Sequence, residues 1–438
     1  MNLVIVQVGQ NQIKERSIAV KMIKAKKHDF VNGKTLLVTI DIGKTTNMGY
    51  CRCPDGTEVK PFEFFNHAEG FQKLWGCICK VKTANHVEKV AVGIESTGAY
   101  GEPLVHYLSQ KGVRVVQVNP LHTKRLKELQ GNSPGKTDRK DPKVIADIIE
   151  LGHALTVVIP EGVAADLRRL THARERTLQR RTVLYNQLQD LVFILFPEFL
   201  QVMKKIKSRT VRYLLQHYPT PQDIVKCGLE ALVSIVRQIS CRRLKRERVE
   251  TLYEAACKSV GIEQGQRSIV FEIQEILSWI ETCDRFIGKL EQQMSDLLKQ
   301  IPYSRSILSI KGIREVTAAG LIGEVGDFRK FRTLSEILKL AGLDLFEISS
   351  GQHQGARHIS KRGRSLLRKL LYFAAINTIR QGGVMYETYQ RYLQRGMIKG
   401  KALVAIARKL LRILFALVRD HSEYAVNYYE IENLKLAA

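Results

Sequence analysis

Short apolar runs alternate with amphipathic stretches between residues 34 and 158. The apolar runs have the length of strands and lie near 36–41, 47–52, 58–64, 90–95 and 113–118. Helical periodicity is found near 68–82, 101–111 and 140–152. Strands that alternate with helices in this way predict a layered α/β domain. Residues 1–33 precede it as a basic extension, to which the sequence assigns no function.

Helical periodicity dominates residues 159–300. One long amphipathic stretch runs from about residue 162 to 200, where Pro197 ends or kinks it, and a second runs from about 263 to 300. A basic insertion over 201–260, also of helical character, separates them. Two long helices joined through a helical tip predict either an antiparallel coiled-coil arm or an ordinary helical bundle. Both arrangements would leave apolar surface for dimerisation.

Residues 301–438 form a third, mostly helical region. Its first part, residues 308–322 around Gly312, fits a helix-hairpin-helix layout. The glycine turn would free backbone N–H groups at a helix start to hold a phosphate. We therefore expect Lys311 and Gly312 to contact nucleic acid.

Four carboxylates lie where elements of the α/β domain end or begin. Asp41 and Glu95 each end an apolar strand, and Asp138 and Asp141 lie three residues apart at the start of a helix, on one face. Strand, strand and helix in this order is the arrangement of a ribonuclease-H-like fold. Taken singly, each acid is more typical of a helix cap or a solvated side chain. The position of Asp147, beyond the first turn of the same helix, favours a structural role for that residue. Together the four predict a metal site.

Carboxylate oxygens are the ligands that Mg²⁺ prefers. Two such ions about 4 Å apart can activate a nucleophile and stabilise the leaving oxygen of a phosphodiester. The charge of the chain points to the same substrate, because 69 Lys and Arg face 43 Asp and Glu, a net charge of +26. Phosphate neutralisation supplies most non-specific affinity for nucleic acid.

An acidic membrane surface is the rival partner for a basic chain. No apolar run approaches 18 residues and no signal-peptide layout is present. We therefore expect a cytoplasmic, nucleoid-associated protein with no membrane partner. Basic side chains in three regions are the expected nucleic-acid contacts: Lys136, Arg139, Lys140, Arg242, Arg243, Lys245, Arg246, Arg357, Lys361, Arg362, Arg364 and Arg368.

A serine pair offers a second kind of chemistry. Ser349 and Ser350 precede Gly351 in a loop that is followed by clustered Arg and Lys. Such a serine could attack a phosphodiester whose charge the cations stabilise. Ser360, just before a basic helix, is interpreted as its N-cap.

Residue spacing argues against a zinc site and a P-loop. The Cys-x-Cys pairs Cys51/Cys53 and Cys77/Cys79 lack zinc-knuckle spacing, and in a strand such residues only share a face, as expected of reduced thiols. A P-loop ending at Gly43 would require a glycine at position 38, which is Val38. An actin-like or sugar-kinase ATPase also starts with Asp-x-Gly-x-Thr, but would carry a second such loop, and leaves the basic charge unexplained.

Taken in order, these motifs resemble those of insertion-sequence transposases with an N-terminal RuvC-like domain and a C-terminal transposase domain. The former bears an Asp-Glu-Asp-Asp (DEDD) set and the latter a serine. The resemblance covers about residues 34–385. It rests on the motifs at 40–44, 93–98, 136–141, 312–328, 349–351 and 359–363.

The resemblance implies a RuvC-like domain at 34–158, a coiled-coil arm at 159–300 and a transposase domain at 301–438. It implies that Asp41, Glu95, Asp138 and Asp141 bind Mg²⁺, with two ions per site. The serine beside Gly351, which is Ser350 unless Ser349 replaces it, would form a covalent phosphoserine with DNA.

The resemblance also implies partners and a reaction path. Members excise the element and insert it into a target through a circular intermediate, guided by a structured non-coding RNA, the bridge RNA. Dimers would assemble into a tetramer in which one subunit's acids join another's serine. The alternatives are a RuvC-like structure-specific endonuclease that uses metal-activated water, and a DNA- or RNA-binding protein whose acids are structural.

Overall fold

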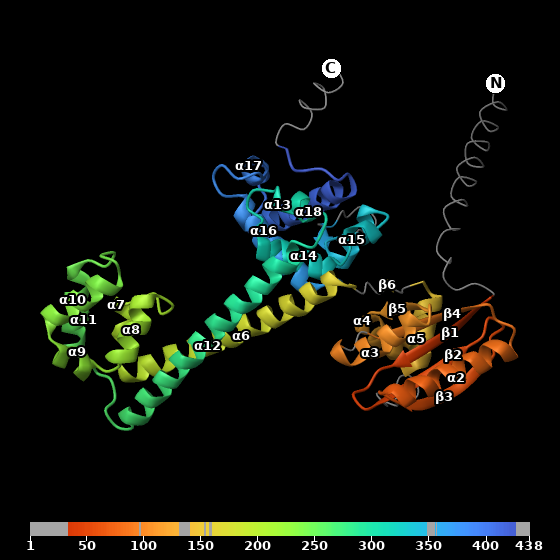
Figure 1. The fold of residues 1–438 in the computed structure, drawn as a ribbon, viewed down its shortest axis with the longest axis horizontal. Coiled ribbons are helices and arrows are strands. Elements are labelled where there is room, and N and C mark those ends of the chain that lie inside the picture. Colours follow the sequence, from red (N-terminus) through yellow and green to blue (C-terminus); the bar gives the residue numbers. More distant parts are fainter. Residues whose placement is uncertain are drawn as a thin grey trace, which may run out of the picture. The chain divides into compact units, whose positions relative to one another are not determined.

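The computed structural model describes residues 34–95, 98–130, 141–152, 155–156, 160–347, 355 and 357–425. The chain divides into two compact units, residues 1–158 and 159–438. Figure 1 shows an α/β layer in the first unit and helices almost throughout the second.

The first unit is built on a mixed sheet, which confirms the predicted α/β class. Its strands have the order β3-β2-β1-β4-β5-β6. Strands β1, β4 and β5 run parallel, whereas β2, β3 and β6 pair antiparallel with their neighbours. Without the two-residue β6, this is the strand order of a ribonuclease-H-like fold. The bounds are β1 Thr35–Asp41, β2 Thr46–Arg52, β3 Glu58–Phe65, β4 Lys89–Glu95, β5 Arg114–Val118 and β6 Leu155–Thr156.

Helices cover this sheet, and α5 packs directly on β1 and β4. A Cβ added to Gly93 on β4 would lie 2.1 Å from Ile149 Cδ1, so the glycine lets α5 pack flat on the strand. The hydroxyl of Thr39 on β1 donates to the Pro142 carbonyl over 2.6 Å and fixes the first turn of α5. The helices are α2 Ala68–Ala84, the 3₁₀ turn η2 Gly98–Gly101, α3 Glu102–Gln110, α4 Pro120–Gln130 and α5 Asp141–Glu150.

Two long helices dominate the second unit: α6 Val163–Leu195 and α12 Gln266–Leu298. They confirm the two long helices expected from the periodicity. They run antiparallel, because the start of α6 shares a core with the end of α12 and the end of α6 with the first half of α12. Figure 1 shows them side by side. Ion pairs cross between them, with Arg174 2.7 Å from Glu291 and Arg181 bound to Asp284.

A small helical cluster, the tip, joins the far ends of these helices. The region therefore combines the two predicted arrangements, an antiparallel pair of long helices and a helical bundle. The tip consists of α7 Phe199–Val202, α8 Arg209–His217, α9 Pro221–Cys227, α10 Leu229–Ile239 and α11 Arg246–Cys257. Its core contains Phe196, Leu214, Leu232 and Leu252. The helical character predicted for 201–260 is confirmed.

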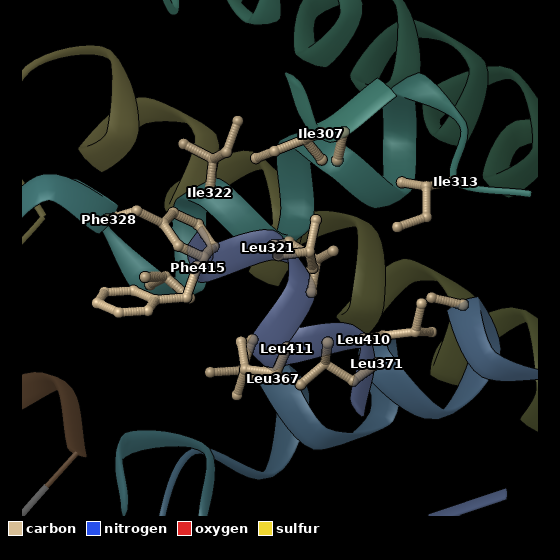
Figure 2. Close-up of a cluster of buried hydrophobic side chains, with 14 of the residues drawn as sticks. Ile307, Ile313, Leu321, Ile322, Phe328, Leu367, Leu371, Leu410, Leu411 and Phe415 are labelled. Atoms are coloured by element: carbon tan, nitrogen blue, oxygen red, sulfur yellow. The ribbon is translucent and has the colours of Figure 1, made fainter. Parts of the chain in front are cut away.

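The other end of the helix pair packs into a C-terminal bundle. Ile307, Leu321, Phe328, Leu371 and Leu410 meet in its core (Figure 2). Its helices are α13 Ser304–Leu308, α14 Glu315–Val325, the 3₁₀ turn η3 Phe328–Lys330, α15 Leu334–Ala341, α16 Ser365–Thr378, α17 Tyr386–Gln394 and α18 Lys399–Arg419. Strands β7 Leu345–Phe346 and β8 His358–Ile359 form a short antiparallel hairpin.

The segment around Gly312 joins α13 to α14. Gly312 has a φ of 110°, a backbone conformation that favours glycine, and it packs against the end of α16 at Asn377 and Thr378. The preceding helix α13 has five residues. Binding of a phosphate here by Lys311 and Gly312 stays a prediction.

All eight cysteines lie within the described residues, as free thiols. No helix in the described part of the chain combines the length and apolar character needed to cross a membrane.

Candidate active site

The register of the parallel strands places Asp41 beside Glu95. Ile40 on β1 is paired with Ile94 on β4, so the residues that follow them lie on neighbouring strands about 4.8 Å apart. Side chains alternate along a strand, so Asp41 shares a face with Thr39, and Glu95 with Gly93. Helix α5 covers that face. Both acids therefore lie under the start of α5.

Asp141 is the first residue of α5 and is almost buried. Its carboxylate lies 2.6 Å from the Lys127 ammonium on α4. Thr123, one turn earlier on α4, is buried and hydrogen-bonds to Glu95. Two strand ends and two helices thus bring Asp41, Glu95 and Asp141 into one site.

The electrostatics of Glu95 show how closely the acids interact. Burial raises the pKa of Glu95, and the like charges of Asp41 and Asp141 raise it further. The hydrogen bond from Thr123 and the positive charge of Lys127 act in the opposite direction. The single ammonium group of Lys127 therefore offsets only part of the mutual repulsion among the three carboxylates.

The donor set fits a hard divalent cation in kind, since carboxylate oxygens crowded together gain from such an ion. Among the residues that the structure describes, no group of three carboxylate, imidazole or thiolate side chains is close enough together to hold a metal ion in the observed arrangement. Lys127 occupies a carboxylate oxygen of Asp141 that an ion would use. Binding an ion would thus require Lys127 to move away from Asp141.

Several predicted residues lie outside the described residues: Asp138, Lys136, Arg139, Lys140, Ser349 and Ser350. Asp147 is described, and it binds Arg52 on β2 at 2.8 Å, in a network with Glu58 and Glu150. That ion pair fits the structural role expected for Asp147.

The chain segment that contains Ser349 and Ser350 connects β7 to β8. At the base of this hairpin Ser360 N–H donates to the Asp344 carbonyl over 2.9 Å, and the Ser360 hydroxyl binds the Asp344 carboxylate. Helix α16 begins only at Ser365, with Arg364 at its N-cap position. The N-cap interpretation of Ser360 is therefore wrong, because its hydroxyl closes the hairpin before the helix begins.

Several of the basic side chains expected to touch nucleic acid bind protein groups. Arg364 donates to the Glu324 carbonyl, and burial lowers its pKa to about 10. Arg368 donates to two backbone carbonyls, and Arg357 pairs with Glu347 at 2.9 Å. Arg246 binds Glu230 and Glu250. Arg242, Arg243, Lys245, Lys361 and Arg362 are exposed.

Sequence reasoning missed Thr123 and Lys127 because it assigned no helix to residues 120–130. A local signal was present. Asn119 accepts a hydrogen bond from Leu121 N–H through its side chain at 2.9 Å, and Pro120 is the first helical residue. Asparagine followed by proline is a common helix start.

Two segments of the chain match families of known proteins. Residues 38–197 match an IS110-type family, named for its DEDD residues and described as transposase. Residues 304–390 match the transposase IS116/IS110/IS902 family.

Relatives match most of the chain. A 43.6 kDa protein of insertion element IS110 from Streptomyces coelicolor is 25% identical over 88% of this chain and 94% of its own length. A 44.8 kDa protein of IS116 from Streptomyces clavuligerus is 23% identical over 87% and 94%. The transposase for IS1111A from Coxiella burnetii is 25% identical over 80% and 86%.

Fold, acidic site and matches together define a DNA-processing enzyme, a transposase. The chain belongs to the IS110 family, with an N-terminal DEDD domain and a C-terminal transposase domain. Its DEDD domain implies a divalent metal ion, and its activity implies binding of DNA.

Proposed function

We propose that the chain cuts and rejoins donor and target DNA of an insertion sequence, using its four acids and one serine. The observation that carries the proposal is the convergence of Asp41, Glu95 and Asp141 at the ends of β1 and β4 and the start of α5. These three, with Asp138, would hold Mg²⁺ in the site. When bound, the ion supplies positive charge beside the reacting phosphate and its leaving oxygen.

We assign the nucleophile to Ser350, with Ser349 as the alternative. Its Oγ forms a bond to phosphorus while the bond to the leaving strand breaks. The leaving oxygen becomes a hydroxyl and the serine proton passes to a base. A hydroxyl of the other DNA then attacks the phosphoserine and releases the serine, so the number of phosphodiester bonds is conserved.

RNA guidance and assembly complete the proposal. The resemblance to bridge-RNA-guided recombinases supports a structured non-coding RNA as partner, and a net charge of +26 suits a chain that holds RNA and DNA together. The same resemblance supports dimers that assemble into a tetramer, with the long helices α6 and α12 in the dimer contact. We also propose its domain limits, 34–158, 159–300 and 301–438.

The test is a covalent adduct assay. Purified chain is incubated with Mg²⁺, the flanking non-coding RNA and labelled donor and target DNA, and denatured products are analysed for protein-linked DNA. We expect an adduct in the wild type, none in Ser350→Ala, and none without RNA. Ser360→Ala is the matched control, because Ser360 binds Asp344 at the hairpin base.

Other outcomes identify the alternatives. An adduct lost only in Ser349→Ala would move the nucleophile by one residue. Cleavage without any adduct would make the chain a RuvC-like endonuclease that uses metal-activated water. Absence of Mg²⁺-dependent cleavage would leave a nucleic-acid-binding protein whose acids are structural.

A further inference from the structure

A cavity of about 410 Å³ lies in the first unit, away from the acids. Helix α2 contributes Trp75 and Lys82, the start of β4 contributes Lys89, the turn after α3 contributes Lys111, and the start of β5 contributes Arg114. The parallel strands β1 and β4 begin here and end at the acidic site. At about 3.3 Å per residue, the seven residues of β4 separate the two places by roughly 20 Å.

The walls of this cavity are strongly basic. Lys82, Lys89, Lys111 and Arg114 face a single acid, Glu88, whose carboxylate lies 3.1 Å from the Lys34 ammonium. The ammonium groups of Lys82, Lys89 and Lys111 therefore outnumber the acidic groups of the lining and would attract an anion. A group that carries several phosphates, spaced along a chain, fits this distribution better than a single small anion.

An aromatic wall is combined with one of these charges. The Lys111 ammonium lies 5.8 Å from the centre of the Trp75 ring and 5.6 Å from the centre of the Tyr107 ring. Two cation–π contacts thus hold Lys111 at the cavity rather than leaving it to move in solvent. Trp75 is only partly buried, so its ring has surface to offer.

We propose that this cavity binds an unpaired stretch of single-stranded nucleic acid, with a base stacked on Trp75 and its phosphates held by Lys82, Lys89 and Lys111. Stacking on an aromatic ring is worth about 1–3 kcal/mol per base and tolerates any sequence, while cations follow the backbone. The inference rests on the proposed action on nucleic acid. It adds a binding site distinct from the acids, which strengthens binding without touching the reacting bond.

Tryptophan fluorescence of the full chain tests this proposal. The chain has two tryptophans, Trp75 and Trp279, so a Trp279→Phe background leaves Trp75 as the sole reporter. Ten-nucleotide oligothymidylate and oligouridylate are titrated separately in EDTA, which prevents cleavage. We expect Trp75 emission to be quenched by one or both, and the preferred strand tells whether DNA or RNA is the natural occupant.

Substitution of the cavity then separates a site from general charge. The double substitution of Lys82 and Lys111 by alanine should weaken the affinity measured by quenching at least about tenfold. It should also lower the slope of log K against log salt concentration by about 0.7 for each phosphate that is no longer neutralised. Lys60→Ala is the matched control, an exposed lysine on β3 outside the cavity. The site is refuted if Trp75 emission does not respond, if Lys60→Ala has the same effect, or if inorganic phosphate competes as well as the oligomers.

The acids provide the control for the proposed function. In Asp41→Asn the quenching should remain while Mg²⁺-dependent cleavage is lost. Quenching without cleavage in the wild type would overturn the proposed function and leave the cavity proposal intact. Cleavage with an unresponsive Trp75 would do the opposite.

Discussion

At the scale of single residues, Glu95 and Lys127 determine the charge of the acidic site in the absence of an ion. Glu95 lies between two like charges at the end of a strand, whereas Lys127 neutralises Asp141 from the neighbouring helix. The repulsion among the three carboxylates of the site is therefore only partly offset by Lys127. Substitutions of these two residues should have opposite effects on stability.

Glu95→Gln should raise stability and abolish activity. The pKa of Glu95 is raised in the folded chain, so folding is favoured when Glu95 is protonated. Its ionised form lowers the free energy of unfolding at neutral pH, and this penalty vanishes as the pH falls below the unfolded value of about 4.3. Thermal unfolding in EDTA should give a higher melting temperature at about pH 7 and no gain at about pH 4.

The same variant should lose DNA cleavage at least about 100-fold, because even outer partners of metal ligands cost 10–100-fold. Glu63→Gln, which removes an exposed carboxylate on β3, is the control for the change in net charge. A lower melting temperature of Glu95→Gln at neutral pH would show that Glu95 is stabilised by its neighbours, contrary to this account.

Lys127→Met should make the chain more dependent on Mg²⁺. Without Lys127, Asp141 loses its 2.6 Å partner and the three acids repel one another. The melting temperature in EDTA should fall, and Mg²⁺ should stabilise the variant at lower concentrations than the wild type. A concentration of 100 times the dissociation constant stabilises by about 2.7 kcal/mol. Lys124→Met on the same helix should leave the Mg²⁺ midpoint unchanged, and equal midpoints in both variants would refute the competition.

Some residues of this site could be predicted from the sequence. Asp41 and Glu95 follow short apolar runs of strand length, so their position at strand ends was predictable. Which strands are neighbours depends on the pairing of β1 with both β2 and β4, and no local pattern states this. Lys127 was missed because its importance comes from the packing of α4 against α5.

At the scale of elements, the length of the periodic pattern decided what could be predicted. α6 and α12 repeat their apolar positions over many turns, and both were found to within a few residues. β6, β7 and β8 have two residues each and show no pattern of their own. Their pairing is imposed by the chain around them.

The junction between α6 and the tip depends on a glycine. A Cβ on Gly261 would lie 1.8 Å from the Leu195 carbonyl oxygen, because the chain before α12 passes close to the end of α6. Gly261→Ala should therefore lower the free energy of unfolding of the arm, by about 1–3 kcal/mol for forced overpacking. Calorimetry of the full chain would report a lower transition temperature.

Gly288→Ala is the matched variant on α12. A Cβ there meets nothing within 4 Å, and alanine is favoured over glycine inside a helix by about 0.8–1.0 kcal/mol. This substitution should raise the same transition. If both variants moved the transition in the same direction, the close approach at Gly261 would not control the junction.

At the scale of the whole molecule, the net charge of +26 comes from basic side chains of two kinds. Some form ion pairs within the fold, and others are exposed to solvent. Arg246 belongs to the first kind, since it binds Glu230 and Glu250. Arg242, Arg243 and Lys245, in the turn that precedes α11, belong to the exposed kind. The sequence showed one basic cluster, and only the fold separates its members.

That separation predicts how binding to DNA responds to salt. If the turn touches duplex phosphates, replacing Arg242, Arg243 and Lys245 by alanine should weaken affinity and reduce the slope of log K against log salt by about 0.9 for each phosphate that the turn neutralises. Arg246→Ala should leave the slope nearly unchanged, because its guanidinium is already paired with the carboxylates of Glu230 and Glu250. Fluorescence anisotropy with labelled duplex over a salt series measures both. An unchanged slope in the triple variant would mark the tip as a solvated surface, and would confine DNA binding to the other basic regions of the chain.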